Sequence, residues 1–172
     1  MVTVLEKVDE ADVAASVQAR SDAEAGIMLR FHSPDDYLVA LYSPKLKALY
    51  IHDRKNGGWG AELGRVEVPD IGPRIELKAA VSGEYAAAIL TDGTKTYRTP
   101  TVKVSNAASG KVGLWLFQIG DRQEYADFKL CRAEPGKFPA LVQGVPVMWT
   151  DTFHAPDVPS PQDWVLVLER VK

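Results

Sequence analysis

The chain has 172 residues, of which 46% are hydrophobic and 25% charged, with a formal net charge of −3 at pH 7. This size predicts a single domain over residues 1–172 that can bury a full core without disulfides or metals. The acidic balance argues against nucleic-acid binding, which usually needs a basic face. No apolar run reaches the ~20 residues of a membrane-spanning helix, so membrane insertion is not expected.

The cysteine content and the N-terminus restrict the compartment. Cys131 is the only cysteine, so neither an intrachain disulfide nor a thiolate metal site can form within the chain. The first residues, MVTVLEKVDEADV, carry acids and lack the apolar run of a signal peptide. We therefore expect either a cytoplasmic protein or a mature or excised part of a secreted one.

In chain order, the first predicted strands cover residues 2–6 and 13–19. A helix over residues 8–20 is the alternative, because alanine is frequent there. We favour a strand, since every second residue is apolar and its neighbours are smaller or polar. The alternating residues are Val13, Ala15, Val17 and Ala19.

The next segment, GIMLRFHSPDDYLVALYS at residues 26–43, predicts a β-hairpin. Its residues alternate with period two on both sides of a polar turn at residues 33–36. Before the turn, one set of alternating residues is expected to fill the core: Ile27, Leu29 and Phe31. The intervening residues are then expected to point outward: Met28, Arg30 and His32.

Further strands follow between turns that are rich in Gly, Pro and Asp. They are predicted at residues 46–53, 59–68, 74–81, 84–91, 94–99, 111–119 and 123–132. The Asp92-Gly93 pair suits a type I′ turn. Residues 133–146 form a connector rich in Pro and Gly, and two last strands are predicted at 147–153 and 164–169. Many short strands without a long helix predict a two-sheet antiparallel β-sandwich or a barrel.

Three motifs carry a family resemblance. Residues 26–43 resemble the central hairpin of laminin-G-like jelly rolls, AAAILTDGTKTY resembles an Asp-Gly hairpin of that family, and GKVGLWLFQIGDRQEYADFKL resembles its closing strands. By the order and spacing of these motifs, residues 12–132 resemble a laminin-G-like domain of the concanavalin A-like lectin and glucanase superfamily. The resemblance implies an all-β, two-sheet jelly roll that binds carbohydrate. It also implies that the protein is extracellular or periplasmic and, in some cases, that the domain is part of a larger multidomain protein.

The end of the chain departs from the family order. The segment MWTDTFHAPDVPSPQDWVLVLE resembles the segment that usually opens the domain, but here it comes last. Two arrangements stay open. In a circularly permuted chain, residues 147–172 supply the family's first strands, and such permutation costs little because domain termini often lie close together. In the other arrangement, the segment is a C-terminal extension that lies over the sandwich.

Candidate ligand-binding residues follow from strand alternation. Val112, Leu114 and Leu116 are expected in the core, so Trp115 and Phe117 should point outward. An indole stacks on the apolar face of a pyranose, and a guanidinium donates hydrogen bonds in a fixed geometry. We therefore predict a glycan site at Arg30, His32, Tyr42, Trp115 and Phe117, although either orientation of Tyr42 is open. The alternative is that the C-terminal segment covers Trp115 and Phe117, which then form a second core.

The resemblance also implies a metal. Many carbohydrate-binding jelly rolls hold a structural calcium ion near their first and last strands, bound by carboxylate and carbonyl oxygens. Asp127 in YADFKL and Asp151 in WTDTF match those places. The alternative is that Asp127 makes a buried hydrogen bond or caps a turn.

Catalysis is less expected than binding. The β-glucan-cleaving relatives carry Glu-x-Asp-x-(x)-Glu on one strand, because retaining hydrolysis needs two carboxyl groups about 5–5.5 Å apart. The chain lacks this motif. We therefore predict a non-catalytic carbohydrate-binding module or glycan-recognition domain for an oligo- or polysaccharide. The alternatives are a structural or protein-interaction domain and, least favoured, a glycoside hydrolase.

Overall fold

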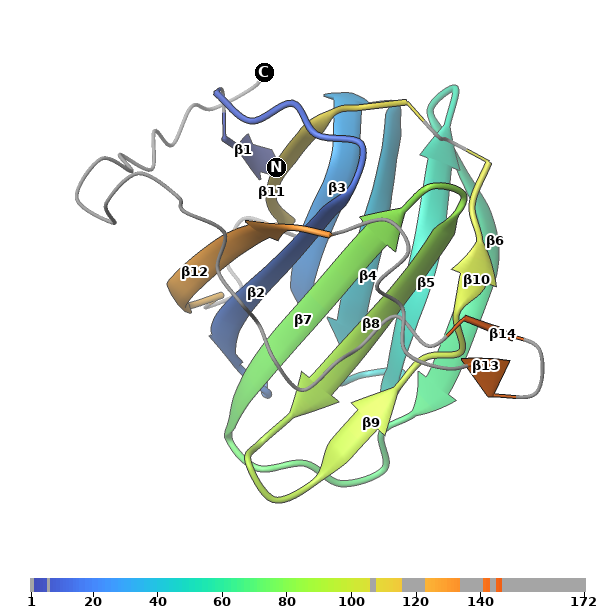
Figure 1. The fold of residues 1–172 in the computed structure, drawn as a ribbon. Helices are drawn as coiled ribbons and strands as arrows, with labels where there is room; N and C mark the ends of the chain where they lie inside the picture. The colour runs from blue at the N-terminus through green and yellow to red at the C-terminus, as the bar shows by residue number, and fades with distance from the viewer. Residues whose placement is uncertain are drawn as a thin grey trace.

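The computed structural model of the chain describes residues 2–5, 7–105, 108–115, 123–133, 141–142 and 145–146. These residues form strands and turns, and two antiparallel sheets lie face to face (Figure 1). The predicted all-β, two-sheet sandwich is confirmed. Within the described parts of the chain there is no helix long and apolar enough to cross a membrane.

The first sheet contains six strands in the order β1-β11-β3-β4-β5-β6. Their bounds are β1 Val2–Val4, β11 Lys111–Trp115, β3 Ala25–Ser33, β4 Asp36–Ser43, β5 Ala48–Lys55 and β6 Gly58–Glu67. Strands β3 and β4 form the predicted central hairpin, with Ser33 opposite Asp36 across the turn. This sheet therefore has the short β1 at one edge and the long β6 at the other.

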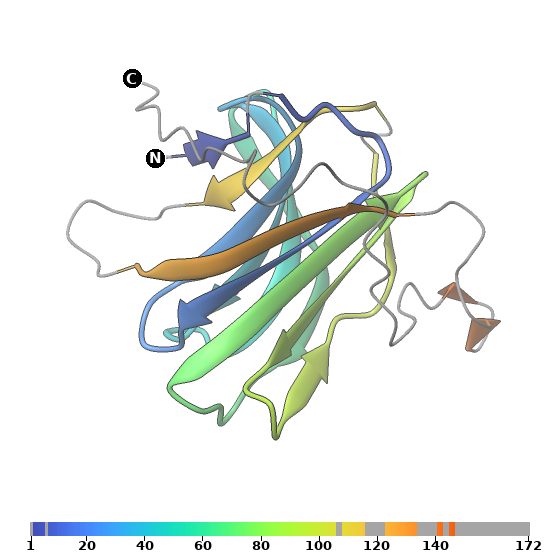
Figure 2. The same ribbon diagram turned by 60° about the vertical axis from the view of Figure 1, so that its left-hand side comes forward.

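The second sheet has the order β10-β8-β7-β2-β12, and β9 also pairs with β8. Its strands are β10 Val102–Lys103, β8 Tyr85–Thr91, β7 Arg74–Ser82, β2 Val13–Arg20, β12 Tyr125–Arg132 and β9 Thr96–Arg98. Strand β2 excludes the alternative of a helix over residues 8–20. Figure 2 shows the two layers from the side.

The C-terminal part of the chain contains one hairpin that was not predicted and two predicted strands that the structure does not describe. The connector at residues 133–146 contains a hairpin of two short strands, β13 Leu141–Val142 and β14 Val145–Pro146, which the sequence did not predict. The strands predicted at residues 147–153 and 164–169 lie outside the described residues. The choice between permutation and extension therefore stays a prediction.

The main core lies between the two sheets. It is built from alternating apolar residues of both layers, among them Val13 and Val17 from β2, Ile27 and Leu29 from β3, and Leu77 from β7, all at most 2% exposed. Burying one large apolar side chain fully is worth roughly 1.5–3 kcal/mol. Most of the stability of the fold is therefore expected to come from the core between the two sheets.

The β5–β6 turn shows how local sequence sets strand register. Asn56 and Gly57 have φ values of 51° and 75° and connect Lys55 to Gly58, which is the two-residue type I′ geometry that Asn-Gly favours. The Gly57 N–H also donates to the Asp35 carbonyl in the β3–β4 turn at 3.2 Å. The two hairpin ends of the first sheet are thereby joined.

The type I′ turn predicted at Asp92-Gly93 is wrong. Thr91 pairs with Thr96, so the connection has four residues, and of the Asp-Gly pair only Gly93 has a positive φ, 88°. The Asp92 carboxylate accepts hydrogen bonds from the backbone N–H groups of Thr94 at 2.8 Å and Lys95 at 2.7 Å. An aspartate side chain that replaces backbone partners in this way stabilises a longer loop.

Candidate functional site

Arg30 does not point outward, and this prediction is wrong. Between Met28 and Phe31, strand β3 has one residue more than its partner β11, and Arg30 takes a φ of 50° in the resulting β-bulge. The bulge reverses the alternation that the sequence suggested. Phe31 joins Met28 on the face that points away from the second sheet, and the Arg30 side chain is fully buried.

The buried guanidinium of Arg30 connects the two sheets. Its Nε and Nη2 donate to the Ala11 carbonyl at 2.8 and 2.5 Å, and Nη2 donates to the Gly83 carbonyl at 2.7 Å. Asp12 lies 4.0 Å away. Burial lowers the pKa of Arg30, and the Asp12 charge opposes that shift. Arg30 is therefore placed as a structural residue rather than as a donor to a ligand.

The other predicted ligand residues are scattered. Tyr42 lies in the core between the sheets, where its hydroxyl donates to the Ser21 carbonyl at 3.3 Å, so the orientation left open by the sequence is inward. His32 is exposed beside the β3–β4 turn. Phe117 lies outside the described residues. Those of the predicted ligand residues that the structure describes are thus not gathered into one site.

Trp115 points away from the main core, as predicted, since Val112 and Leu114 lie inside it. It lies on the outer face of the first sheet, the face directed away from the second sheet. There it belongs to a second hydrophobic group, which we call the outer cluster: Val4, Met28, Phe31, Tyr37, Val39, Leu41, Ala48, Tyr50 and Trp115. Trp115 is only 7% exposed. This burial agrees with one part of the alternative, that Trp115 belongs to a second core, whereas Phe117 and the C-terminal segment expected to cover them lie outside the described residues.

Next to the outer cluster, β5 and β6 present three cross-strand pairs. Tyr50 lies opposite Arg65, His52 opposite Glu62, and Arg54 opposite Trp59. Residues directly opposite one another in an antiparallel pair project from the same face. Because Tyr50 belongs to the outer cluster, and Val39 and Tyr37 of that cluster lie opposite His52 and Arg54, all three pairs lie on the outer face. We call these six residues the β5–β6 row.

Trp59 is the exposed aromatic residue of this row. It is 48% exposed, and its ring contacts Trp115 edge-on with 6.4 Å between the centroids. The centroid distances to Tyr37 and His52 are 6.3 and 5.3 Å. The Arg54 guanidinium carbon lies 4.9 Å from the Trp59 centroid, within the range of a cation–π interaction. These contacts hold the indole at the border between the buried outer cluster and solvent.

His52 and Arg54 bring unused polar atoms to the same place. Their buried Nδ1 and Nε atoms make no hydrogen bond with any described residue. Arg54 does form an ion pair with Asp35 at 3.6 Å. Burial lowers the pKa of His52, while the Glu62 charge and the Gly60 carbonyl oppose the shift. A neutral imidazole keeps one ring nitrogen as a hydrogen-bond acceptor.

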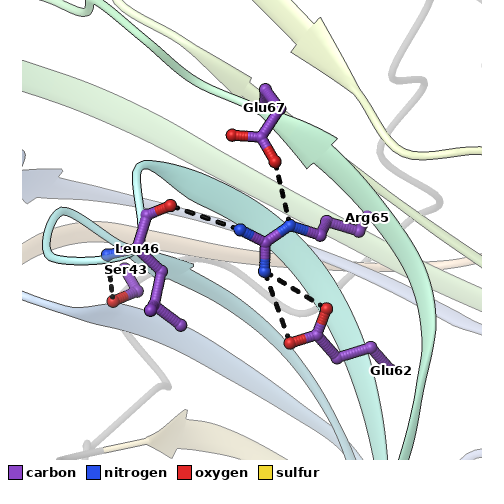
Figure 3. Close-up of polar contacts among 5 residues, drawn as sticks. All are labelled: Ser43, Leu46, Glu62, Arg65 and Glu67. Carbon is purple, nitrogen blue, oxygen red and sulfur yellow. Dashed lines mark hydrogen bonds and ion pairs between the residues drawn. The ribbon is translucent and has the colours of Figure 1, made fainter.

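Arg65 is fixed by two carboxylates and a carbonyl (Figure 3). Its Nη1 donates to both Glu62 oxygens at 3.4 and 3.3 Å, its Nε donates to Glu67 at 3.1 Å, and its Nη2 donates to the Leu46 carbonyl at 3.3 Å. The carboxylates raise the pKa of Arg65. The row therefore ends in a partly exposed Arg–Glu pair held in a fixed orientation.

The predicted calcium site is half outside the described residues. Asp127 is exposed and has a φ of 51° at a bulge in β12, whereas Asp151 lies beyond the described part of the chain. The residues that the structure describes contain no cluster of three or more His, Cys, Asp or Glu side chains suited to a metal. These residues alone do not make a calcium site, and the ion stays a prediction that depends on Asp151.

Comparison with known proteins identifies the fold. Neither a family model nor a curated protein matches the chain. The carbohydrate-binding module CBM66 from Bacillus subtilis has a TM-score of 0.53 and 16% identity over 63% of this chain and 68% of that one. Chicken galectin 2 has a TM-score of 0.54 and 12% identity over 75% of this chain and 96% of that one.

A third similar structure is the xylan β-1,4-xylosidase from Bacillus halodurans C-125. It has a TM-score of 0.51 and 16% identity over 70% of this chain but only 27% of that one. The likenesses establish the fold of this chain as the concanavalin A-like lectin and glucanase type, in agreement with the sequence resemblance. Two of these three structural neighbours are a carbohydrate-binding module and a galectin.

Proposed function

We propose that the chain is a non-catalytic carbohydrate-recognition domain whose ligand lies against Trp59 on the outer face of the first sheet. The observation that carries this proposal is the β5–β6 row. It places an exposed indole, two arginines, a histidine and a glutamate on one face. Sugar rings need an aromatic surface for their C–H groups and fixed donors and acceptors for their hydroxyls, and the row offers both.

Each part of the row has a role in this proposal. The Trp59 indole packs against the apolar face of a sugar ring. Arg65 and Glu62 supply donors and acceptors that are already oriented by their mutual hydrogen bonds at 3.3 and 3.4 Å. His52 lies in the middle of the row and Arg54 lies opposite Trp59, so their side chains support the surface beside the indole from below. Such a ligand would be an oligo- or polysaccharide. The proposal also includes an extracellular or periplasmic location of the protein.

One observation favours a second candidate, a structural or protein-interaction sandwich. The outer cluster fills much of the outer face, with Tyr37 and Trp115 at 3% and 7% exposure. A face packed in this way offers a ligand only its border at β5 and β6. The two candidates differ in one respect, because only the first needs the Trp59 border to bind sugar.

The test is a glycan-array screen of the full chain, followed by titration calorimetry on the strongest hit. We expect Trp59→Ala to weaken binding by about 2 kcal/mol or more, as for a central aromatic anchor. Leu46→Ala is the matched control, since Leu46 is the other exposed large apolar residue of the described chain, at 47%, and alanine keeps the backbone carbonyl that bonds Arg65. A folded Trp59→Ala protein with unchanged affinity contradicts the proposed site. A folded wild-type chain that binds no glycan favours the second candidate.

A further inference from the structure

A cavity of about 570 Å³ opens at the end of the sandwich where β2 ends and β7 begins. It is lined by residues from the β2–β3 turn, the segment before β7 and the β8–β9 loop, including Arg20, Asp22, Pro73, Arg74 and Asp92. Figure 1 shows that the β8–β9 loop and the β5–β6 turn lie at opposite ends of the molecule. No residue of the β5–β6 row lines the cavity, so the two sites are separate. Its volume lies in the range of small-molecule sites, about 300–1,000 Å³.

Two arginines stand side by side at this cavity. Arg20 on β2 lies directly opposite Arg74 on β7. Like charges in such positions repel one another unless other groups compensate them. Arg20 is compensated: its Nε and Nη2 bond both oxygens of Asp22 at 2.9 and 2.5 Å, and Glu124 lies 3.8 Å away. Arg20 with Asp22 thus forms a nearly neutral pair.

The second carboxylate of the cavity is fully used within the protein. Asp92 Oδ1 accepts from the Thr94 N–H, the Thr94 hydroxyl and the Lys95 N–H at 2.7–2.8 Å, and Oδ2 accepts from the Gly72 N–H at 2.7 Å. These donors hold the pKa of Asp92 well below its usual range. An ionised carboxylate offers about four acceptor positions, so Asp92 has little capacity left for a ligand hydroxyl.

Arg74 is different. Its side chain is exposed, and it forms no hydrogen bond or ion pair with any residue in the described part of the chain. The nearest acid along the same face of β7, Glu76, pairs with Lys78 at 3.1 Å. A guanidinium carries five N–H donors in a planar fork that matches carboxylate and sulfate oxygens. The groups of this cavity that are left to bind a ligand are therefore the N–H donors of Arg74.

We propose that this cavity binds the carboxylate or sulfate group of an acidic sugar through Arg74, with Arg20 beside it. The cavity is far larger than a free anion needs, and the apolar ring of Pro73 lines it next to Arg74. An anionic group carried on a ring-sized molecule can use both features. This site is distinct from the Trp59 border and does not depend on it.

The test is an NMR titration of the ¹⁵N-labelled full chain with glucuronate, glucose and inorganic sulfate in separate arms at constant ionic strength. We expect glucuronate to shift the signals of residues 20–22 and 72–74 and of the Arg74 side chain, while glucose leaves them in place. Arg74→Ala should weaken glucuronate binding at least tenfold, and Arg74→Lys should weaken it less. Arg98→Ala, which removes an exposed arginine on β9 outside the cavity, should leave it unchanged.

The spectra of the variants also report whether each one is folded. Trp59→Ala should keep glucuronate binding, so failure of the Trp59 border and failure of this cavity are separate results. The absence of shifts with glucuronate overturns the proposal, as does unchanged binding in folded Arg74→Ala. Equal affinity for sulfate and glucuronate overturns the assignment to a sugar, because the site would then recognise only the free anion.

Discussion

Arg30 is a buried cation whose orientation a simple period-two pattern predicts wrongly, because the residue lies in a β-bulge. It donates to two backbone carbonyls from segments that flank the second sheet, at Ala11 and Gly83. A buried carbonyl that loses its donor costs about 1–3 kcal/mol, and the hydrogen bonds to these two carbonyls are partly buried. Arg30 therefore stabilises the contact between the layers, although its charge is desolvated.

We expect Arg30→Ala to reduce the free energy of unfolding by about 3 kcal/mol, because it leaves a cavity and two carbonyls without a partner. Urea unfolding followed by tryptophan fluorescence measures this loss. Arg98→Ala, at an exposed arginine on β9, is the control and should unfold like the wild type. A stability of Arg30→Ala equal to that of the control would contradict the structural role assigned here.

At the scale of elements, the bulges of β3 and β6 decide which side chains share a face. In β6, the residues opposite Tyr50, His52 and Arg54 are Arg65, Glu62 and Trp59, so spacings of three replace the regular spacing of two. A strict period of two would place Glu62 on the face opposite to Arg65 and Trp59. Glycines permit these irregularities where the backbones approach closely: a Cβ at Gly60 would lie 2.6 Å from the Asp53 carbonyl oxygen.

The bulge in β3 needs a similar glycine. A Cβ at Gly110 would lie 2.6 Å from the Arg30 backbone carbon, closer than real Cβ contacts come. We expect Gly110→Ala to lower the melting temperature strongly, because the clash is with backbone and cannot be relieved by a rotamer change. Gly58→Ala is the control, since its nearest contact is an ordinary 3.6 Å. Thermal unfolding by circular dichroism compares the two variants, and equal melting temperatures would show that the bulge is not constrained at Gly110.

At the scale of the whole molecule, the sandwich and most of its strands could be predicted, because period-two patterns and turns rich in Gly, Pro and Asp act locally. The central hairpin, the β5–β6 turn and the orientation of Trp115 were predicted correctly. The candidate site was largely missed. His52, Arg54, Glu62 and Arg65 come together through bulges and cross-strand pairing, and no local pattern shows either. The strand after Asn56-Gly57 did signal a hairpin, and pairing outward from that turn would have placed Arg54 next to Trp59.

The C-terminal segment gives the first prediction for the whole chain. Residues 147–172 contain Trp149, Phe153, Trp164 and Val165, and each large apolar side chain that is buried contributes roughly 1.5–3 kcal/mol. If the permuted arrangement is correct, removing residues 146–172 should unfold the protein or cause aggregation through an opened sheet edge. Expression of residues 1–145 with thermal unfolding checks this. A soluble fragment that keeps its cooperative transition favours the dispensable extension.

Calcium binding gives the second prediction for the whole chain. If Asp127 and Asp151 hold an ion that binds only the folded chain, calcium at a hundredfold excess over its Kd should stabilise the fold by about 2.7 kcal/mol. Differential scanning calorimetry with calcium and with a chelator measures the shift in melting temperature. Asp127→Asn should abolish it. Identical melting curves under the two conditions would remove calcium from the description of this domain.

If the Trp59 border binds sugar as proposed, the hydrogen bond from Gly57 to the Asp35 carbonyl bears on the rates of ligand association and dissociation. Together with the Arg54–Asp35 ion pair at 3.6 Å, it fixes the β5–β6 turn against the β3–β4 turn beside Trp59. A surface ordered before the ligand arrives loses little conformational entropy on binding. Association then needs no slow rearrangement and proceeds at ordinary diffusional rates. Differences in affinity between sugars would consequently appear mainly in their dissociation rates, that is, in residence times.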